Sequence, residues 1–240
     1  MLDRSKVNKE REHFDRIASS YDNMFGFSAK KRRRKTDWIV QNSHLSSKII
    51  VLELGCGTGL STETFAETRA KIHAIDLSFR LLRIAKNLRH YQNVCYEVAD
   101  VEALPFPTAF FDAVIGTFVL HHFNMKTALT EIHRVCKPGA WISFSEPNML
   151  NPVVFAIKHV PWIKRMVGDS PDETAFIRWN LARVLKEHLF GNIKIEPIEF
   201  LPPGLPNILA PAINKVGHIL EKIPLIREFG GTLLIRARRL

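Results

Sequence analysis

A short apolar segment runs directly into three glycines at alternate positions, and this pattern constrains the fold more than any other in the chain. Residues 49–54 read Ile-Ile-Val-Leu-Glu-Leu, and Gly55, Gly57 and Gly59 follow. A continuous apolar run of this length, bounded by turn residues, is typical of a strand buried in a parallel sheet. Because glycine adopts backbone conformations that other residues avoid, the pattern predicts a tight turn that presents bare backbone to a ligand.

The glycine spacing and the preceding acid indicate which ligand this turn binds. A dinucleotide fingerprint is Gly-x-Gly-x-x-Gly, but here Leu60 stands where the third glycine should be, and no lysine follows to make a P-loop. Glu53 would repel a phosphate, whereas it would pair well with an ammonium group. We therefore predict a nucleoside that carries a cationic amino acid. The alternative is a glycine-rich turn that binds no ligand.

Two further acids end apolar segments and support a nucleoside site. Asp76 closes the segment 72–76, ~20 residues after the glycines, where a carboxylate can accept hydrogen bonds from ribose hydroxyls. Asp100 follows the segment 94–99, where it could accept from an adenine amino group beside Val101. Each acid taken singly is better explained as a strand-end acid or a helix cap. Three such signals in succession favour the nucleoside.

On these residues the chain resembles the class I S-adenosylmethionine-dependent methyltransferases. Within them it is most similar to the type 11 group, which includes the ubiquinone and menaquinone C-methyltransferases. The matching segments are Phe14–Asp22, Leu52–Gly59, Asp76–Ser78, Asp100–Phe106, Phe111–Val114, Leu120–Phe123 and Arg134–Ala140. They lie in family order between residues 12 and 147. The resemblance is specific for the cofactor and weak for the substrate.

The resemblance implies S-adenosyl-L-methionine as the cofactor and a role for each matching residue. It assigns the methionine part to Glu53, Gly55, Cys56, Gly57 and Gly59, and the ribose and adenine to Asp76, Leu77, Asp100, Val101 and Glu102. Thr117 and Phe118 would lie near the sulfonium. Tyr21 would belong to a lid helix over the cofactor, although packing of that helix on the body explains this tyrosine equally well.

Alternating apolar strands and helical segments predict an α/β fold, a doubly wound, mostly parallel seven-stranded sheet; the resemblance implies that its last strand is antiparallel. We expect one domain over residues 1–240: a helical lid and basic helix (1–47), a cofactor-binding core (48–147), and substrate-side helices with the last strands (148–240). The predicted elements include helices over about 8–24 and up to about 43, a tight turn at Lys137–Gly139, and strands Ala140–Ser145, Ile193–Phe200 and Thr232–Arg238.

The net charge of +10 is confined to the two flanks of the core. Residues 1–47 hold 11 basic and 6 acidic residues, residues 48–147 hold 10 of each, and residues 148–240 hold 13 and 8. The six consecutive bases Lys30–Lys35 are consistent with contact to nucleic acid or anionic lipid. A solvated helix face is the interpretation that we favour slightly over any single partner.

Two apolar segments on the substrate side depart from a minimal fold. Within 151–167, Phe155, His159, Trp162 and Met166 recur at helical spacing beside bases, and a second apolar segment spans 201–231. Two helices that cap a core are one interpretation; the other is an apolar cap over a lipophilic substrate, with peripheral contact to a membrane surface.

The N-terminus and the cysteines bear on the compartment. The polar start predicts no signal peptide, and no apolar stretch reaches ~18 residues. Cys56, Cys95 and Cys136 show no metal-binding spacing. They favour reduced, buried thiols in a cytoplasmic protein, and we predict no metal site.

The function predicted from these features is methyl transfer to an oxygen or carbon of a small or amphiphilic molecule. Such an acceptor must lose a proton, and His121 or His122 after the fourth strand could take it, with Glu146 as a second candidate. Helix capping and packing are the alternative roles of the two histidines. Methylation of RNA or DNA, or a non-catalytic binding module, are the alternative functions. The sequence leaves the acceptor and the oligomeric state open.

Overall fold

The computed structural model describes residues 4–25, 29–170, 173–200, 217 and 219–240, and its described part is built on a seven-stranded sheet. The strands are β1 (Ile50–Leu54), β2 (Lys71–Asp76), β3 (Val94–Val98), β4 (Phe111–Thr117), β5 (Cys136–Pro147), β6 (Phe190–Ile198) and β7 (Thr232–Arg239). Their order is β3-β2-β1-β4-β5-β7-β6. Only β7 runs antiparallel to its neighbours, β5 and β6. The predicted fold class is therefore confirmed.

Helices cover both faces of the sheet, which explains why the first strand is apolar without alternation. One core cluster includes residues of α3 (Ala29–Asn42), α4 (Thr62–Ala66) and α5 (Phe79–Leu88); the other includes residues of α6 (Met125–Val135), α9 (Arg178–Glu187) and the 3-10 turn η2 (Val101–Ala103). Val51 belongs to the first cluster and Leu52 to the second. Successive side chains of β1 thus point into different apolar layers, as expected for a central parallel strand.

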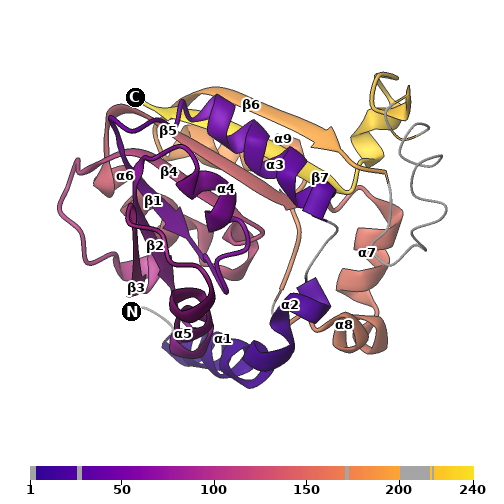
Figure 1. Cartoon of the computed structure of the whole chain (residues 1–240). Helices are drawn as coiled ribbons and strands as arrows, with labels where there is room; N and C mark the ends of the chain where they lie inside the picture. Colours follow the sequence, from indigo (N-terminus) through magenta and orange to yellow (C-terminus); the bar gives the residue numbers. More distant parts are fainter. Residues whose placement is uncertain (1–3, 26–28, 171–172, 201–216, 218) are drawn as a thin grey trace.

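A helical layer lies across one end of the sheet (Figure 1). It consists of α1 (Arg4–Ile17), the 3-10 turn η1 (Ala18–Ser20) and α2 (Tyr21–Phe25), with α7 (Pro152–His159) and α8 (Pro161–Val167) beside them. Asp15 of α1 accepts a hydrogen bond from the Ser78 hydroxyl at 2.5 Å, and the His13 Nε2 lies 3.0 Å from the Gly168 carbonyl oxygen. Helix α1 therefore bridges the body of the sheet and the end of α8.

The segment 151–167 forms two helices, because its sequence contains two start signals. Asn151 accepts hydrogen bonds from the backbone N–H groups of Val153 and Val154, and Pro152 occupies the first turn of α7. Pro161 then begins α8, and Gly168 ends it with φ of +84°. The segment is helical as predicted, but the break at Val160 places Phe155 on α7 and Trp162 and Met166 on α8, and all three side chains are exposed.

Three details of the sequence prediction were wrong. Lys137–Gly139 lies within β5 instead of before it, as an irregular stretch between the pairs Cys136–Phe111 and Trp141–Ala113, with Gly139 at φ of +79°. The sixth strand begins at Phe190 and ends at Ile198. Cys95 is exposed, because its position near the sheet edge in β3 leaves it facing outward, whereas Cys56 and Cys136 are buried.

Two shorter elements complete the described chain, the 3-10 turns η3 (Leu120–His122) and η4 (Ile226–Phe229). Most of the predicted apolar insertion, residues 201–216 and 218, lies outside the described residues. None of the helices in the described ranges is both long enough and apolar enough to cross a bilayer.

Candidate functional site

The glycine turn after β1 has the left-handed backbone that its sequence predicts. Gly55, Gly57 and Gly59 have φ of +59°, +55° and +82°, a region that residues with a Cβ rarely adopt. A Cβ on Gly55 would stand 2.2 Å from the Cγ2 of Val119. The Gly57 N–H donates to the Asp76 Oδ2 at 2.9 Å, which joins the ends of β1 and β2.

The acids at the ends of β2 and β3 hold the backbone of the loops that follow them. Asp76 accepts a second hydrogen bond from the Ser78 N–H at 2.8 Å, and burial raises its pKa against the lowering effect of these backbone donors. Asp100 accepts from the Glu102 N–H at 2.9 Å and caps η2. Both acids line the same cavity, so the structural and the ligand-binding interpretations of each are compatible.

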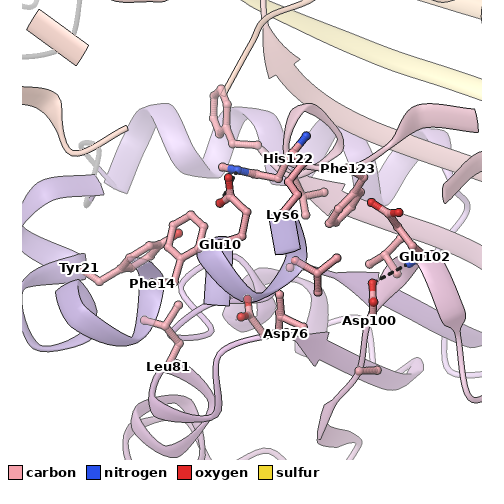
Figure 2. A pocket seen from close by; sticks show the side chains of 17 residues that line it. Lys6, Glu10, Phe14, Tyr21, Asp76, Leu81, Asp100, Glu102, His122 and Phe123 are labelled. Carbon is pink, nitrogen blue, oxygen red and sulfur yellow. Dashed lines mark hydrogen bonds and ion pairs between the residues drawn. The ribbon is translucent and has the colours of Figure 1, made fainter. Parts of the chain in front are cut away.

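The cavity that these acids line is the smaller of two neighbouring cavities. It is drawn in Figure 2 and has a volume of about 80 Å³. It is lined by eight of the residues predicted to bind cofactor, Tyr21, Gly55, Asp76, Leu77, Asp100, Val101, Glu102 and Phe118. Helix α1 contributes Val7, Glu10 and Phe14 to its wall. Its volume is below the range of about 300–1,000 Å³ typical of ligand pockets. Helix α1 therefore narrows the space above the strand-end acids.

A larger cavity of about 490 Å³ adjoins the first and lies within that range. Its apolar wall comes from α7 and α8, including Val154, Ile157 and Val167. Of the predicted site residues, Cys56, Thr117 and His121 line only this cavity. The two cavities share Phe14, Tyr21, Gly55, Phe118 and His122 in their walls. These five residues mark the place where a molecule in one cavity meets a molecule in the other.

The turn after β4 carries the shared residue Phe118 in a strained conformation. Its φ is +53°, and its N–H donates to the Ser145 carbonyl oxygen at 2.7 Å, which holds the strained turn in place. The neighbouring Thr117 hydroxyl lies 3.0 Å from the Ser61 hydroxyl. The sequence placed Thr117 and Phe118 near the reacting group, and in the structure both lie beside the larger cavity.

Four predicted residues, Glu53, Gly57, Gly59 and Glu146, line neither cavity. Glu53 is buried beneath the glycine turn, and its Oε2 has no hydrogen-bond partner. Burial raises the pKa of this carboxyl to about 8, although a hydrogen bond with Thr62 opposes the shift. Glu53 is thus a neutral acid at pH 7 that would gain from a nearby cation.

Glu146 serves His121 rather than the cavity. Its Oε1 accepts from the N–H groups of Val119 and Leu120 at 2.9 and 2.8 Å, and its Oε2 lies 2.7 Å from the His121 Nδ1. Burial disfavours a charged His121 ring, but the charge and hydrogen bond of Glu146 outweigh this effect and raise its pKa to about 9. Glu146 therefore orients the imidazole and directs its Nε2 toward the cavity.

Sequence reasoning missed two acids that face the histidines. Glu10 of α1 lies 3.5 Å from the His122 Nδ1, and Glu173 lies 3.8 Å from the nearest ring nitrogen of each histidine. Glu173 also pairs with Lys158 at 2.8 Å. Burial would raise the pKa of Glu173, but the two histidines and Lys158 hold it well below its usual range. No motif marks these acids, because they come from segments far apart in the sequence.

Three bases of the run Lys30–Lys35 form ion pairs with acids elsewhere in the chain. Arg33 pairs with Glu67 at 2.8 Å, Arg34 with Glu221 at 2.7 Å, and the buried Lys35 with Glu199 at 3.0 Å. Lys31, Arg32 and Lys35 line the larger cavity. Three of the six bases thus neutralise acids of the same chain.

Comparison with known proteins agrees with this geometry. Residues 52–144 match the type 11 family model described as a methyltransferase domain. A demethylmenaquinone methyltransferase of Tropheryma whipplei (strain Twist) is 34% identical over 146 residues, 58% of this chain and 60% of the relative. The chain thus spans about three fifths of that relative. One from Thermobifida fusca (strain YX) is 32% identical over 182 residues, which are 70% of this chain and 77% of the relative.

A solved structure supports the fold at lower identity. The S-adenosylmethionine-dependent methyltransferase of Thermotoga maritima superimposes with a TM-score of 0.68. It is 16% identical, and the match covers 96% of this chain and 99% of that one. The residues present fit S-adenosylmethionine, because the Cβ-free turn, Asp76 and Asp100 surround one cavity and Glu53 holds an unpartnered buried oxygen. The chain belongs to the type 11 family of methyltransferase domains, whose cofactor is S-adenosyl-L-methionine.

Proposed function

We propose that the protein transfers a methyl group from S-adenosyl-L-methionine to an oxygen or carbon of a small, amphiphilic molecule. This proposal rests mainly on one observation. The smaller cavity, where the predicted cofactor residues lie, and the larger cavity share a wall that includes Gly55, Phe118 and His122. The cofactor supplies an electrophilic methyl group. The protein has to hold the acceptor in line with it and exclude water, and α1 with α7 and α8 encloses the volume where that happens.

The acceptor is amphiphilic in this proposal because the larger cavity has two kinds of wall. Val153, Val154 and Ile157 of α7 make one side apolar, whereas His121, Lys158 and Glu173 make another side polar. The demethylmenaquinone methyltransferases among the relatives support an acceptor with an apolar part. Oxygen and carbon acceptors share the need to lose a proton during transfer.

His122 is the better candidate for accepting that proton. It lines both cavities, and Glu10 faces its Nδ1, which leaves the Nε2 for the acceptor. His121 lines only the larger cavity, and its Nδ1 is engaged by Glu146 at 2.7 Å. Glu146 is committed to His121 and two backbone N–H groups. We therefore assign His122 as general base, His121 as a polar contact to the acceptor, and Glu146 as its positioning residue.

Calorimetric titration with S-adenosylmethionine and its demethylated product tests the cofactor part. A panel of hydroxylated quinones, hydroxybenzoates and fatty acids then tests the acceptor part, with methyl transfer followed by mass. His122→Ala should retain cofactor affinity and lose turnover at least 100-fold, the lower limit of the range of roughly 10²–10⁴ for loss of a general base. Unchanged turnover in His122→Ala would remove the base assignment, and absent cofactor affinity in the folded protein would remove the enzymatic function.

Methylation of RNA or DNA is the second candidate, because the flanks are basic. The ion pairs of Arg33, Arg34 and Lys35 with acids of the same chain weaken it, since a phosphate would have to compete with them. Nucleic-acid binding that falls steeply with salt would favour this candidate. A non-catalytic binding module predicts no cofactor affinity.

We also propose a cytoplasmic protein that contacts a membrane surface through α7 and α8. Trp162 and Met166 are 61% and 69% exposed beside the exposed Arg165, a combination typical of interfacial helices. Sedimentation with anionic vesicles tests this contact. Trp162→Ser should reduce the bound fraction, and Trp179→Ser, an equally exposed tryptophan of α9, serves as the control.

A further inference from the structure

We infer that the side chains of His121, His122, Glu173 and Glu10 form a binding site for a divalent transition-metal ion at the junction of the two cavities. Potential ligand atoms of His121, His122 and Glu173 all lie within 4.8 Å of one another. Glu10 is added to the set because its Oε2 lies 3.5 Å from the His122 Nδ1. Figure 2 shows Glu10 pointing from α1 toward His122.

The distances between these atoms suit ligands of a common ion better than hydrogen bonds. The His121 Nε2 and Glu173 Oε2 are 3.8 Å apart, as are the His122 Nδ1 and Glu173 Oε1. These separations exceed the usual hydrogen-bond range of about 2.7–3.2 Å. Two ligands that each lie about 2.0–2.1 Å from a tetrahedral zinc ion stand roughly 3.4 Å apart. A contraction of a few tenths of an ångström would therefore close the site on an ion.

Two buried atoms of the cluster face each other at 3.5 Å without forming a hydrogen bond, so neither satisfies the other. The Glu10 Oε2 and the His122 Nδ1 are both buried and accept or donate no hydrogen bond. Glu10 is only 8% exposed. A buried carboxylate oxygen without a partner is costly, and such groups call for an unseen ligand, ion or water.

The far side of three of the four ligands is already fixed by another group. The His121 Nδ1 faces Glu146 at 2.7 Å, and Glu10 accepts from the Ser170 hydroxyl at 2.5 Å. Glu173 accepts from the Ser170 N–H at 2.9 Å and from Lys158 at 2.8 Å. Metal-binding histidines usually donate their other N–H to a carboxylate, which orients the ring and leaves the second nitrogen for the ion.

The charge of the surroundings also favours a cation. Four carboxylates, Glu10, Glu146, Asp169 and Glu173, lie in or beside the cluster, and Lys158 is the lysine paired with two of them. With both imidazoles neutral the set carries −3, which a divalent ion reduces to −1. Because two ligands are imidazoles, zinc, cobalt or manganese suits the site better than magnesium or calcium.

An ion here would tie the lid to the body of the protein. Glu10 belongs to α1, the histidines to the turn after β4, and Glu173 to the segment before α9. The ion would bind the His122 Nδ1, the atom that Glu10 faces when His122 acts as the proposed general base. The metal-loaded protein would therefore hold α1 closed over the site and would be catalytically inactive. The binding itself does not rest on the proposed function.

Zinc titration of the full chain tests the inference. The background is Cys95→Ser, because Cys95 is an exposed thiol that would bind zinc on its own. Chelator-treated protein should take up one Zn²⁺ per chain, with little response to Mg²⁺, and Co²⁺ should give the visible absorption of a tetrahedral site. Glu173→Gln and His122→Ala should each weaken zinc binding at least 100-fold. Glu146→Gln should weaken it roughly 10–100-fold, as loss of an orienting carboxylate does.

The control is His159→Ala, since this histidine is exposed on α7 and should leave the affinity unchanged. Cofactor titration of each variant reports whether it is folded and keeps the proposed function separate from this inference. No stoichiometric zinc uptake, or equal affinity in Glu173→Gln, His122→Ala and the control, would overturn the metal site even if cofactor binding is intact. The two imidazoles would then carry protons in place of the ion.

Discussion

The two ends of the candidate site are built in different ways. The cofactor end is formed by the turns after β1, β2 and β3, where three successive strands finish at one edge of the sheet. The acceptor end draws on α1, α3, α7, α8 and Glu173, which are far apart in the sequence. The first end depends on backbone conformation and the second on side chains brought together by tertiary packing. Substitutions should therefore separate the two ends by what they disturb.

The largest effect is expected at Gly55. Gly55→Ala would put a methyl group 2.2 Å from the Val119 Cγ2 at a positive φ, so binding of S-adenosylmethionine should fall more than 100-fold and stability by about 3 kcal/mol. Calorimetry and urea unfolding measure the two effects. Gly217→Ala is the matched control, because a Cβ there meets nothing within 4 Å. Cofactor affinity in Gly55→Ala equal to that of the control would contradict a backbone-determined cofactor end.

A smaller effect is expected at the strand-end acid. Asp76→Asn keeps the shape but loses the charge that holds the N–H groups of Gly57 and Ser78. Hydrogen bonds to a charged acceptor contribute about 1.5–3 kcal/mol, so cofactor affinity should drop roughly 10–100-fold. Asp37→Asn makes the same change on α3, where Asp37 pairs only with the exposed Arg33 among the described contacts. An equal drop in cofactor affinity in both variants would mean that the loss of any negative charge weakens binding, whatever its position.

The contrast between the two ends also explains which parts of the site could be predicted from the sequence. Gly55, Asp76 and Asp100 were predicted correctly to meet, because parallel strands end at one edge and the segments carry local signals. Glu10 and Glu173 could not be predicted, since nothing in their neighbourhood marks them and only the folded chain brings them to His122. The fifth strand was predicted to begin only after a tight turn at Lys137–Gly139, but it begins at Cys136, because Cys136 already pairs with Phe111 before this irregular stretch.

A substitution at the acceptor end should weaken acceptor binding and leave cofactor binding unchanged. Ile157→Asp places a charge on the apolar wall of the larger cavity, so binding of a fluorescent apolar probe should weaken about tenfold while cofactor affinity stays within about twofold. Phe155→Asp makes a comparable change on the same helix, at a residue that is 52% exposed, and should leave both affinities unchanged. A loss of cofactor affinity in Ile157→Asp would break the separation.

The last expected effect is a pH dependence of stability, caused by the buried acid beneath the glycine turn. Glu53 has a pKa of about 8 in the folded protein, against the ordinary value of 4.5 for a glutamate carboxyl. Between these values the folded chain holds a proton that the unfolded chain has lost, so stability falls as pH rises, by at most about 1.4 kcal/mol per pH unit. Below pH 4.5 both states are protonated, and above pH 8 both are ionised, so the slope is confined to that interval.

Glu53→Gln removes this titration. Urea unfolding at pH 5.5, 6.5 and 7.5 should show wild type losing stability relative to Glu53→Gln as pH rises. The control Glu187→Gln, at an exposed carboxyl of α9, should not change the wild-type slope. Saturating S-adenosylmethionine should flatten the slope, because a bound ammonium group favours the ionised carboxylate. A slope that persists with the cofactor bound would mean that Glu53 supports the turn from below and never meets the cofactor's charge. The cofactor end would then be made of backbone and the two strand-end aspartates alone.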